Sequence, residues 1–206
     1  MMRKRFVPLY FSASLACMIP FPGRFAYGLI LVAEVFMLVF VATLLRDAIR
    51  RLEFVRIGNL LFMSLIVSLT MLFRQILTAL LPLAALTLGF ALYVPAVSAF
   101  VAGSFPTDET MGVKSILKRN MSAAALFSCF ALAFFLLRDI VGFGTITYIG
   151  PRGIAEKVLF DSGRIASVSF FATIPGALIA LALILAVSAF IAAKSAPAEK
   201  AETSHD

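Results

Sequence analysis

FVPLYFSASLACMIPFPG, residues 6–23, is an uncharged segment that follows the basic start MMRKR and ends in two prolines. An α-helix needs roughly 20 apolar residues to cross a bilayer, so this segment is short for a full span. Pro20 and Pro22 should end its helix. The segment also carries Cys17, one of only two cysteines in the chain. It therefore predicts a half-helix in the membrane, with a thiol close to its end.

The composition as a whole is that of an integral membrane protein. Hydrophobic residues make up 62% of the chain, charged residues 14%, and the mean hydropathy is +1.02. A soluble domain carries about 25% charged residues. The net charge of +7 is explained by lysines and arginines in cytoplasmic loops, so we expect no nucleic-acid partner. The one histidine, His205, lies in a polar tail, which excludes histidine-based catalysis.

Six apolar runs organise the chain. After residues 6–23 they cover 25–45, 57–81, 86–103, 121–137 and 165–193. We read their order as short, long, long and then the same again, with the first and fourth runs short because prolines interrupt them. Short, interrupted segments at matching places in two halves are typical of inverted repeats with a site between them. The pattern predicts an all-α integral membrane protein of six transmembrane segments, built as two inverted three-helix repeats, with helices 1 and 4 as short half-helices.

The expected domain is a single transmembrane unit over residues 1–195. Its halves are about 1–84 and 85–195, and residues 196–206 form a polar tail expected to be disordered. Most lysines and arginines fall in the segments on the side of the N-terminus. This bias places both termini in the cytoplasm.

Cys17 has three interpretations. A thiolate inside a membrane needs a metal or an iron–sulfur cluster to neutralise it, and partners would have to supply the other ligands. Alternatively, residues 1–16 are a lipoprotein signal peptide, although Ser14 stands where such signals usually carry leucine and five more apolar runs follow. The third interpretation is an inert, buried thiol. Cys129, in the middle of an apolar run, is best explained by inert packing.

Glu34 lies almost at the centre of the 25–45 run. An acid at that depth costs a few kcal/mol on insertion scales and usually faces a cavity, a partner or an ion path. We therefore consider a role for Glu34 in proton or cation movement, with Arg74 or a neighbouring subunit as its partner. A protonated, structural glutamate is the alternative.

The glycine-rich stretch GFGTITYIGPRG, residues 142–153, does not predict a nucleotide site. The dinucleotide fingerprint needs a strand before it and a helix that starts within it, whereas an apolar run precedes this stretch. We expect a loop that turns at the membrane surface, with glycines for backbone freedom.

Four stretches, in this order and spacing, resemble one known family. They are SLACMIPFPG (14–23), LLRDAIRR (44–51), LLRDIVGFGTI (136–146) and ATIPGALIALALILA (172–186). The chain resembles the small hydrophobic subunits that occur in pairs in the Rnf electron-transport complex and in the sodium-pumping NADH:quinone oxidoreductase. The E-type Rnf subunit is the most similar of them.

This resemblance implies a function in a complex. In the family, short helices 1 and 4 each supply a cysteine, and a subunit pairs with a homologue of opposite topology to hold a [2Fe–2S] cluster inside the membrane. Cys17 corresponds to the first ligand. The second position falls near Ser98 and Ala99, and the chain has no cysteine between residues 18 and 128.

The implied protein is a non-autonomous subunit of a redox-driven ion translocase in the bacterial inner membrane. It would help to relay electrons across the membrane while Na⁺ or H⁺ moves. The alternative is a cluster-free paralogue that acts as a small-solute or ion transporter or as a membrane scaffold.

Overall fold

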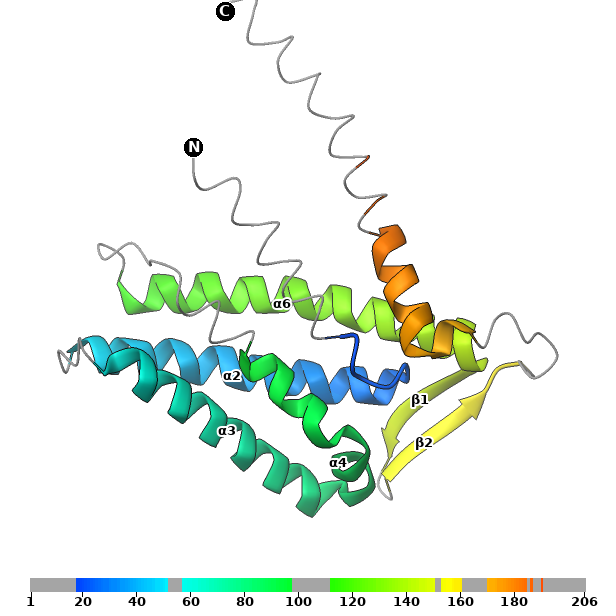
Figure 1. The fold of residues 1–206 in the computed structure, drawn as a ribbon, viewed down its shortest axis with the longest axis horizontal. Helices are drawn as coiled ribbons and strands as arrows, with labels where there is room; N and C mark the ends of the chain where they lie inside the picture. The colour runs from blue at the N-terminus through cyan, green and yellow to red at the C-terminus, as the bar shows by residue number, and fades with distance from the viewer. Residues whose placement is uncertain are drawn as a thin grey trace, which may run out of the picture.

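The computed structural model describes residues 18–51, 57–97, 112–150, 153–160 and 170–184, together with 186 and 190. Most of these residues are helical, as Figure 1 shows. Three helical segments are long and apolar enough to cross a membrane: Phe25–Ile49, Gly58–Leu80 and Val113–Phe143. Two shorter apolar helices cover Pro82–Val97 and Ile174–Ile184. The chain thus has the helices of a membrane protein, in which each span satisfies its own backbone hydrogen bonds.

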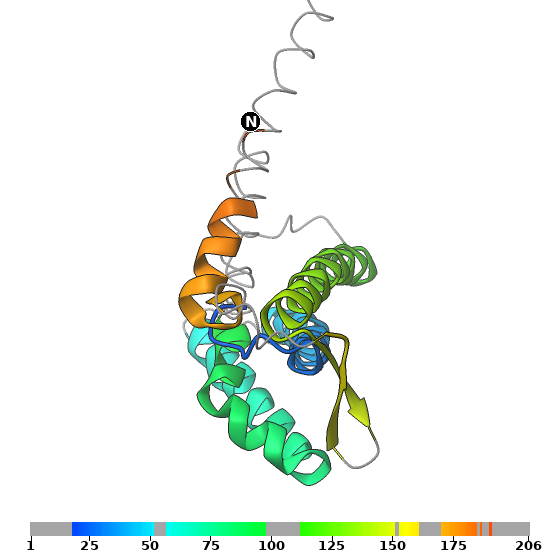
Figure 2. The ribbon, with the colours of Figure 1, turned by 90° about the vertical axis from the view of Figure 1, so that its right-hand side faces the viewer.

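Helices α2 (Phe25–Arg51) and α6 (Val113–Arg138) form an antiparallel pair at the centre of the fold (Figure 1). Viewed nearly end-on in Figure 2, α2 and α6 lie side by side, and the α3–α4 segment lies to one side of them. Gly28 permits the close approach, because a Cβ at that position would lie 2.7–2.9 Å from carbon atoms of the Phe135 side chain. Nearer the other end, Asn120 Nδ2 donates to Thr43 Oγ1 at 3.1 Å.

Helix α3 (Gly58–Leu80) ends because Pro82 follows one residue later. A residue before proline is forced out of the helical region, and Leu81 accordingly has φ −139° and ψ 71°. Pro82 then begins α4 (Pro82–Leu88), the position that proline favours in a helix. Gly89, with φ +44°, takes a conformation that suits glycine and opens the 3₁₀ turn η1 (Gly89–Leu92).

Two hydrophobic clusters fill the interior. The larger one joins the first half of α2 to α4, η1, α6 and the helix Ile174–Ile184. The smaller one joins the second half of α2 to the first half of α3 and Ala96. Many large apolar side chains of α3 and α4 point outward instead, including Leu60, Leu83 and Leu86. An outward apolar surface of this extent is expected where lipid covers the protein.

The glycine-rich stretch is a β-hairpin, so the expectation of a loop is wrong here, and the mostly helical chain also carries a small two-stranded sheet. Strand β1 (Thr145–Gly150) pairs antiparallel with β2 (Gly153–Val158), in a register that sets Thr145 opposite Val158. The β-branched alternation of TITYI suits a strand. The hairpin begins after a π-helical turn, η2 (Asp139–Phe143), that ends at Gly144 with φ +68°.

The predicted spans at 25–45, 57–81 and 121–137 are confirmed as helices of spanning length. The predicted fourth segment is the short helix Pro82–Val97, which starts four residues earlier than expected. The last run becomes helical at Ile174, immediately before Pro175, after a 3₁₀ turn η4 (Phe170–Ala172). Most of the first segment, residues 6–23, lies outside the described residues. A total of six spans stays a prediction.

Candidate functional site

Glu34 lies in the interior of the bundle, between the two hydrophobic clusters. One turn before it on α2, Ile30 and Leu31 belong to the larger cluster, and one turn after it Leu38 belongs to the smaller one. The residue is 0% exposed. In the part of the chain that the structure describes, neither carboxyl oxygen has a hydrogen-bond partner. A polar group buried in this way costs free energy unless something else satisfies it.

Ser128 on α6 is the second buried group without a partner among the described residues. It is 4% exposed. Phe25 approaches Asp139, Gly28 approaches Phe135, and Thr43 approaches Asn120 along the antiparallel pair. Interpolation between these contacts places Ser128 about level with Glu34. The unsatisfied buried polar atoms of the described chain therefore gather at one height, near the middle of two spanning helices.

A broken helix bridges the two clusters. Leu92 belongs to the larger cluster and Ala96 to the smaller one, and these are the clusters that flank Glu34 along α2. The segment between Leu92 and Ala96 contains Pro95, which has no N–H, so it cannot donate to the carbonyl of Ala91. The carbonyl of Ala91 accepts from the backbone N–H of Tyr93 instead.

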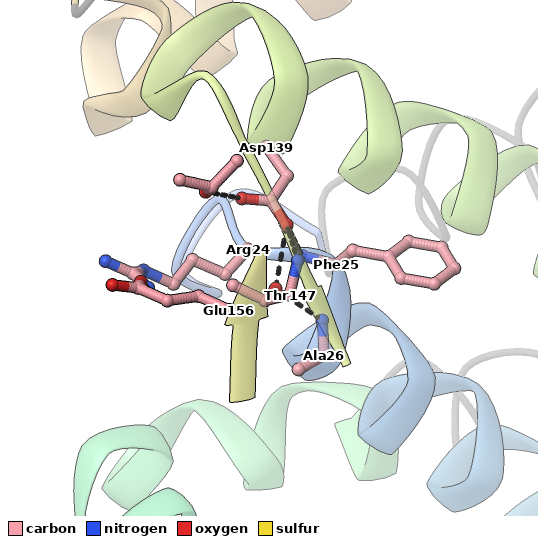
Figure 3. Close-up of polar contacts among 7 residues, drawn as sticks. Arg24, Phe25, Ala26, Asp139, Thr147 and Glu156 are labelled. Atoms are coloured by element: carbon pink, nitrogen blue, oxygen red, sulfur yellow. Dashed lines mark hydrogen bonds and ion pairs between the residues drawn. The ribbon is translucent and has the colours of Figure 1, made fainter. Parts of the chain in front are cut away.

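A second polar site lies at one end of the α2–α6 pair, around Asp139 (Figure 3). This carboxylate is 0% exposed and accepts four hydrogen bonds. Its Oδ2 accepts from the backbone N–H of Phe25 at 3.1 Å, and from the N–H and Oγ1 of Thr147 at 2.7 Å each. Its Oδ1 accepts from Thr145 Oγ1 at 2.9 Å.

Thr147 passes the network on to the start of α2, because its Oγ1 accepts from the N–H of Ala26 at 3.0 Å. The first N–H groups of a helix have no partner within the helix. Asp139 and Thr147 supply acceptors for two of them from a distant part of the chain. A negative charge at a helix N-terminus is also favourable to the helix dipole.

Arg138 joins two further segments to this end of α6. Its Nη1 donates to the carbonyl of Phe21 at 3.3 Å, and its Nη2 donates to the carbonyl of Ala172 at 3.1 Å. Its Nε lies 3.5 Å from the carbonyl of Phe171. Arg138 is 1% exposed, and its guanidinium group holds the turn before α2 against η4, the turn that precedes the last apolar helix. Together, Arg138 and Asp139 fix the ends of four chain segments in one place, which is a structural task.

The residues predicted for a cluster do not come together in the described structure. Cys17, Ser98 and Ala99 lie outside the described residues. Cys129, the one cysteine within them, is exposed. No group of three or more His, Cys, Asp or Glu side chains suited to a metal ion occurs in the described ranges. These residues do not by themselves provide the thiolates that an iron–sulfur cluster needs.

Arg74, which the sequence suggested as a partner for Glu34, is exposed on α3 and donates no hydrogen bond to the carboxyl group of Glu34. The Arg138–Asp139 site was not identified as a site from the sequence. A signal was present, since an Arg–Asp pair closes an apolar run and threonines alternate in TIT just beyond it.

No protein-family model, curated protein or solved structure matches this chain.

Proposed function

We propose that this chain is a membrane subunit of an Rnf-type ion-translocating electron-transport complex and that Glu34 takes part in moving the coupled cation. The observation that carries the second part is the burial of Glu34 at mid-span without a partner among the described residues. An acid at the bilayer centre costs about 2.5–3.5 kcal/mol on insertion scales. A leucine at this position would pack favourably with its apolar surroundings, so the presence of an acid is best explained by a functional role.

Charge balance limits the ion that Glu34 would serve. One carboxylate balances one positive charge, and a divalent ion would keep an uncompensated charge in a medium of low dielectric constant. A proton or a sodium ion meets this condition. The unpaired hydroxyl of Ser128 at the same height adds a neutral oxygen, the kind of ligand that hard cations accept.

The inverted-repeat architecture has support in the arrangement of α2 and α6. Residues 44–47 and 136–139 both read LLRD, and each copy closes one helix of the antiparallel pair. The copies therefore lie at opposite ends of the pair, as two inverted halves of about 1–84 and 85–195 require. We propose six spans, with both termini on the cytoplasmic side of a bacterial inner membrane.

In this proposal the electron-transfer role depends on partners. Cys17 would bring one thiolate to a cluster shared with a homologous subunit of opposite topology, and the cluster would supply one-electron chemistry. A second thiol has to come from outside the short helix Pro82–Val97 and the Ala99 region, because residues 18–128 contain no cysteine.

The test of the cation role is uptake by vesicles that contain the whole complex. We expect Glu34→Gln to lose most of the ion uptake that NADH drives, while Glu156→Gln, a matched change at a surface carboxyl, keeps it. Equal uptake by the wild type and Glu34→Gln across pH would remove Glu34 from the path. The subunit assignment is tested separately, by co-purification of the tagged chain with a homologous membrane subunit and with flavin-bearing subunits.

The second candidate is a cluster-free transporter or scaffold. The missing thiol between residues 18 and 128 favours it. It predicts that the purified chain contains no iron and takes up ions or a small solute in vesicles without an electron donor. Iron in the purified complex that disappears in Cys17→Ala would decide against it.

A further inference from the structure

The β-hairpin carries large apolar side chains that nothing in the described structure covers. The exposed fraction is 65% for Val158, 49% for Tyr148, 50% for Phe160 and 43% for Ile149. Neighbouring Leu159 is also exposed. In a segment that leaves a spanning helix, a surface of this kind needs an explanation.

Two sets of hydrogen bonds fix the height of the hairpin relative to the spanning helices. At its base, the N–H groups of Leu159 and Phe160 donate to the carbonyl of Gly144, at 2.9 and 3.2 Å, one residue after the span Val113–Phe143 ends. Along β1, Thr147 accepts from Ala26, in the first turn of α2. The base of the hairpin and the middle of β1 are thus tied to the level at which spans end.

The hairpin consequently lies across the end of the bundle and does not extend away from it. In Figure 1 it runs crosswise to α2 and α6 at one end of the pair and reaches toward α4. An ion pair of 2.6 Å between Arg24 and Glu156 also holds β2 to the chain that enters α2. Residues in this position lie at the boundary between hydrocarbon and headgroups.

The two faces of the hairpin differ as this position requires. Directly paired residues lie on the same face, and successive residues alternate. Thr145 and Thr147 face the bundle; alternation along β1 puts Ile149 on that same face, and the register adds Val158 and Glu156, whose carboxylate is paired with Arg24. The opposite face carries Tyr148 and Lys157.

We propose that this hairpin is embedded in the lipid interface, with Val158 and Ile149 toward the acyl chains and Tyr148 and Lys157 toward the headgroups. Tyrosine is enriched at this depth because its ring is apolar and its hydroxyl polar, and lysine reaches the headgroups with its charge. The hairpin is tied to the ends of spans whose own outward side chains are apolar. Lipid is therefore the occupant, and a protein partner is an outcome of the test.

The absence of tryptophan from the whole chain allows a direct test, because one introduced tryptophan is the only such fluorophore. Val158→Trp and Tyr148→Trp are placed in the full-length protein in phosphatidylcholine–phosphatidylglycerol vesicles. Leu126→Trp, at a residue that is 67% exposed near the middle of α6, serves as the control for a side chain deep in lipid. Emission maximum, quenching by brominated lipids and quenching by acrylamide are then measured.

We expect brominated lipids to quench Val158→Trp nearly as strongly as Leu126→Trp, and acrylamide to quench it little. Tyr148→Trp should respond to both quenchers. A red-shifted emission of Val158→Trp with strong acrylamide quenching would place the hairpin in water and overturn the proposal. Protection from both quenchers in the assembled complex would overturn it in favour of a protein partner.

Discussion

Replacing Asp139 should separate the two roles of its carboxylate, as a charge and as an acceptor for buried donors. Asp139→Ala leaves the N–H groups of Phe25 and Thr147 buried without an acceptor. Each such group costs about 1–3 kcal/mol, so the free energy of unfolding should fall by about 2–6 kcal/mol. The two threonine hydroxyls can rotate to other acceptors and add less.

Asp139→Asn should be milder. Its amide oxygen can occupy the place of Oδ2, which takes three of the four hydrogen bonds. Its amide nitrogen then faces Thr145 Oγ1, which can accept in place of donating. What is lost is the charge, which makes such hydrogen bonds roughly twice as strong as neutral ones. We expect a loss of about 1–2 kcal/mol.

The assay is thermal unfolding of the full chain in detergent, followed by circular dichroism, together with tryptic cleavage at Lys157. Glu156→Gln is the matched control, because it removes a carboxylate from an exposed ion pair that contributes at most about 1 kcal/mol. We expect the order Glu156→Gln, Asp139→Asn, Asp139→Ala in increasing loss of stability, with faster cleavage of the hairpin in Asp139→Ala alone. If Asp139→Ala unfolded at the same temperature as Glu156→Gln, the network would not be what holds β1 to α2.

Three further predictions use the same unfolding assay or simple labelling. Arg138→Lys should lower the free energy of unfolding by about 2–3 kcal/mol, because an ammonium group cannot reach the carbonyls of Phe21 and Ala172 as the guanidinium fork does; stability equal to the wild type would show that the fork is not needed. Gly28→Ala should lower the free energy of unfolding by about 1–3 kcal/mol through overpacking against Phe135. Gly112→Ala is the control and should cost much less, because a Cβ there would meet nothing within 4 Å. Equal effects of the two changes would contradict the close packing of α2 on α6. Cys129 faces outward within a span, so in a Cys17→Ser background a charged maleimide should not label it in intact vesicles and should label it after unfolding in SDS, and Cys129→Ser should leave ion uptake unchanged; labelling by the charged reagent in intact vesicles would place it in water.

The sequence was sufficient to predict the long helices but not the hairpin and the polar contacts at the end of the α2–α6 pair. Runs of uncharged residues over 25–45 and 121–137 predict helices, because a helix is how a single segment satisfies its backbone in lipid. Pro82 predicts a break for the same local reason. The depth of Glu34 follows from its place within an apolar run, so its burial was also foreseeable.

The hairpin and the Arg138–Asp139 site could not be derived in this way. The strands are six residues each. Their glycines and the apolar run before them hide the hydropathy pattern that would mark them as strands. Three of the four donors to Asp139 are local, on Thr145 and Thr147, but the fourth, the N–H of Phe25, lies more than 100 residues away in sequence. No local pattern reports such a pairing, because the contact exists only when α2 and α6 are already packed antiparallel.

The two LLRD copies show how the residues that follow a motif decide what it does. After 136–139 the chain continues as IVGFGTIT, without charge. Asp139 therefore accepts from N–H and hydroxyl donors of the hairpin and α2, and holds these two segments together. After 44–47 it continues as AIRR, and Asp47 accepts from Arg51 Nε at 2.7 Å, one turn along the helix. Arg51 is largely exposed, and further arginines lie close by in sequence. Since arginine-rich loops tend to stay in the cytoplasm, the proposed topology places the charged copy at the cytoplasmic end of the pair. In that topology Asp139 and the hairpin belong to the opposite face, where the hairpin closes the end of the bundle and its Lys157 lies outside the cytoplasm.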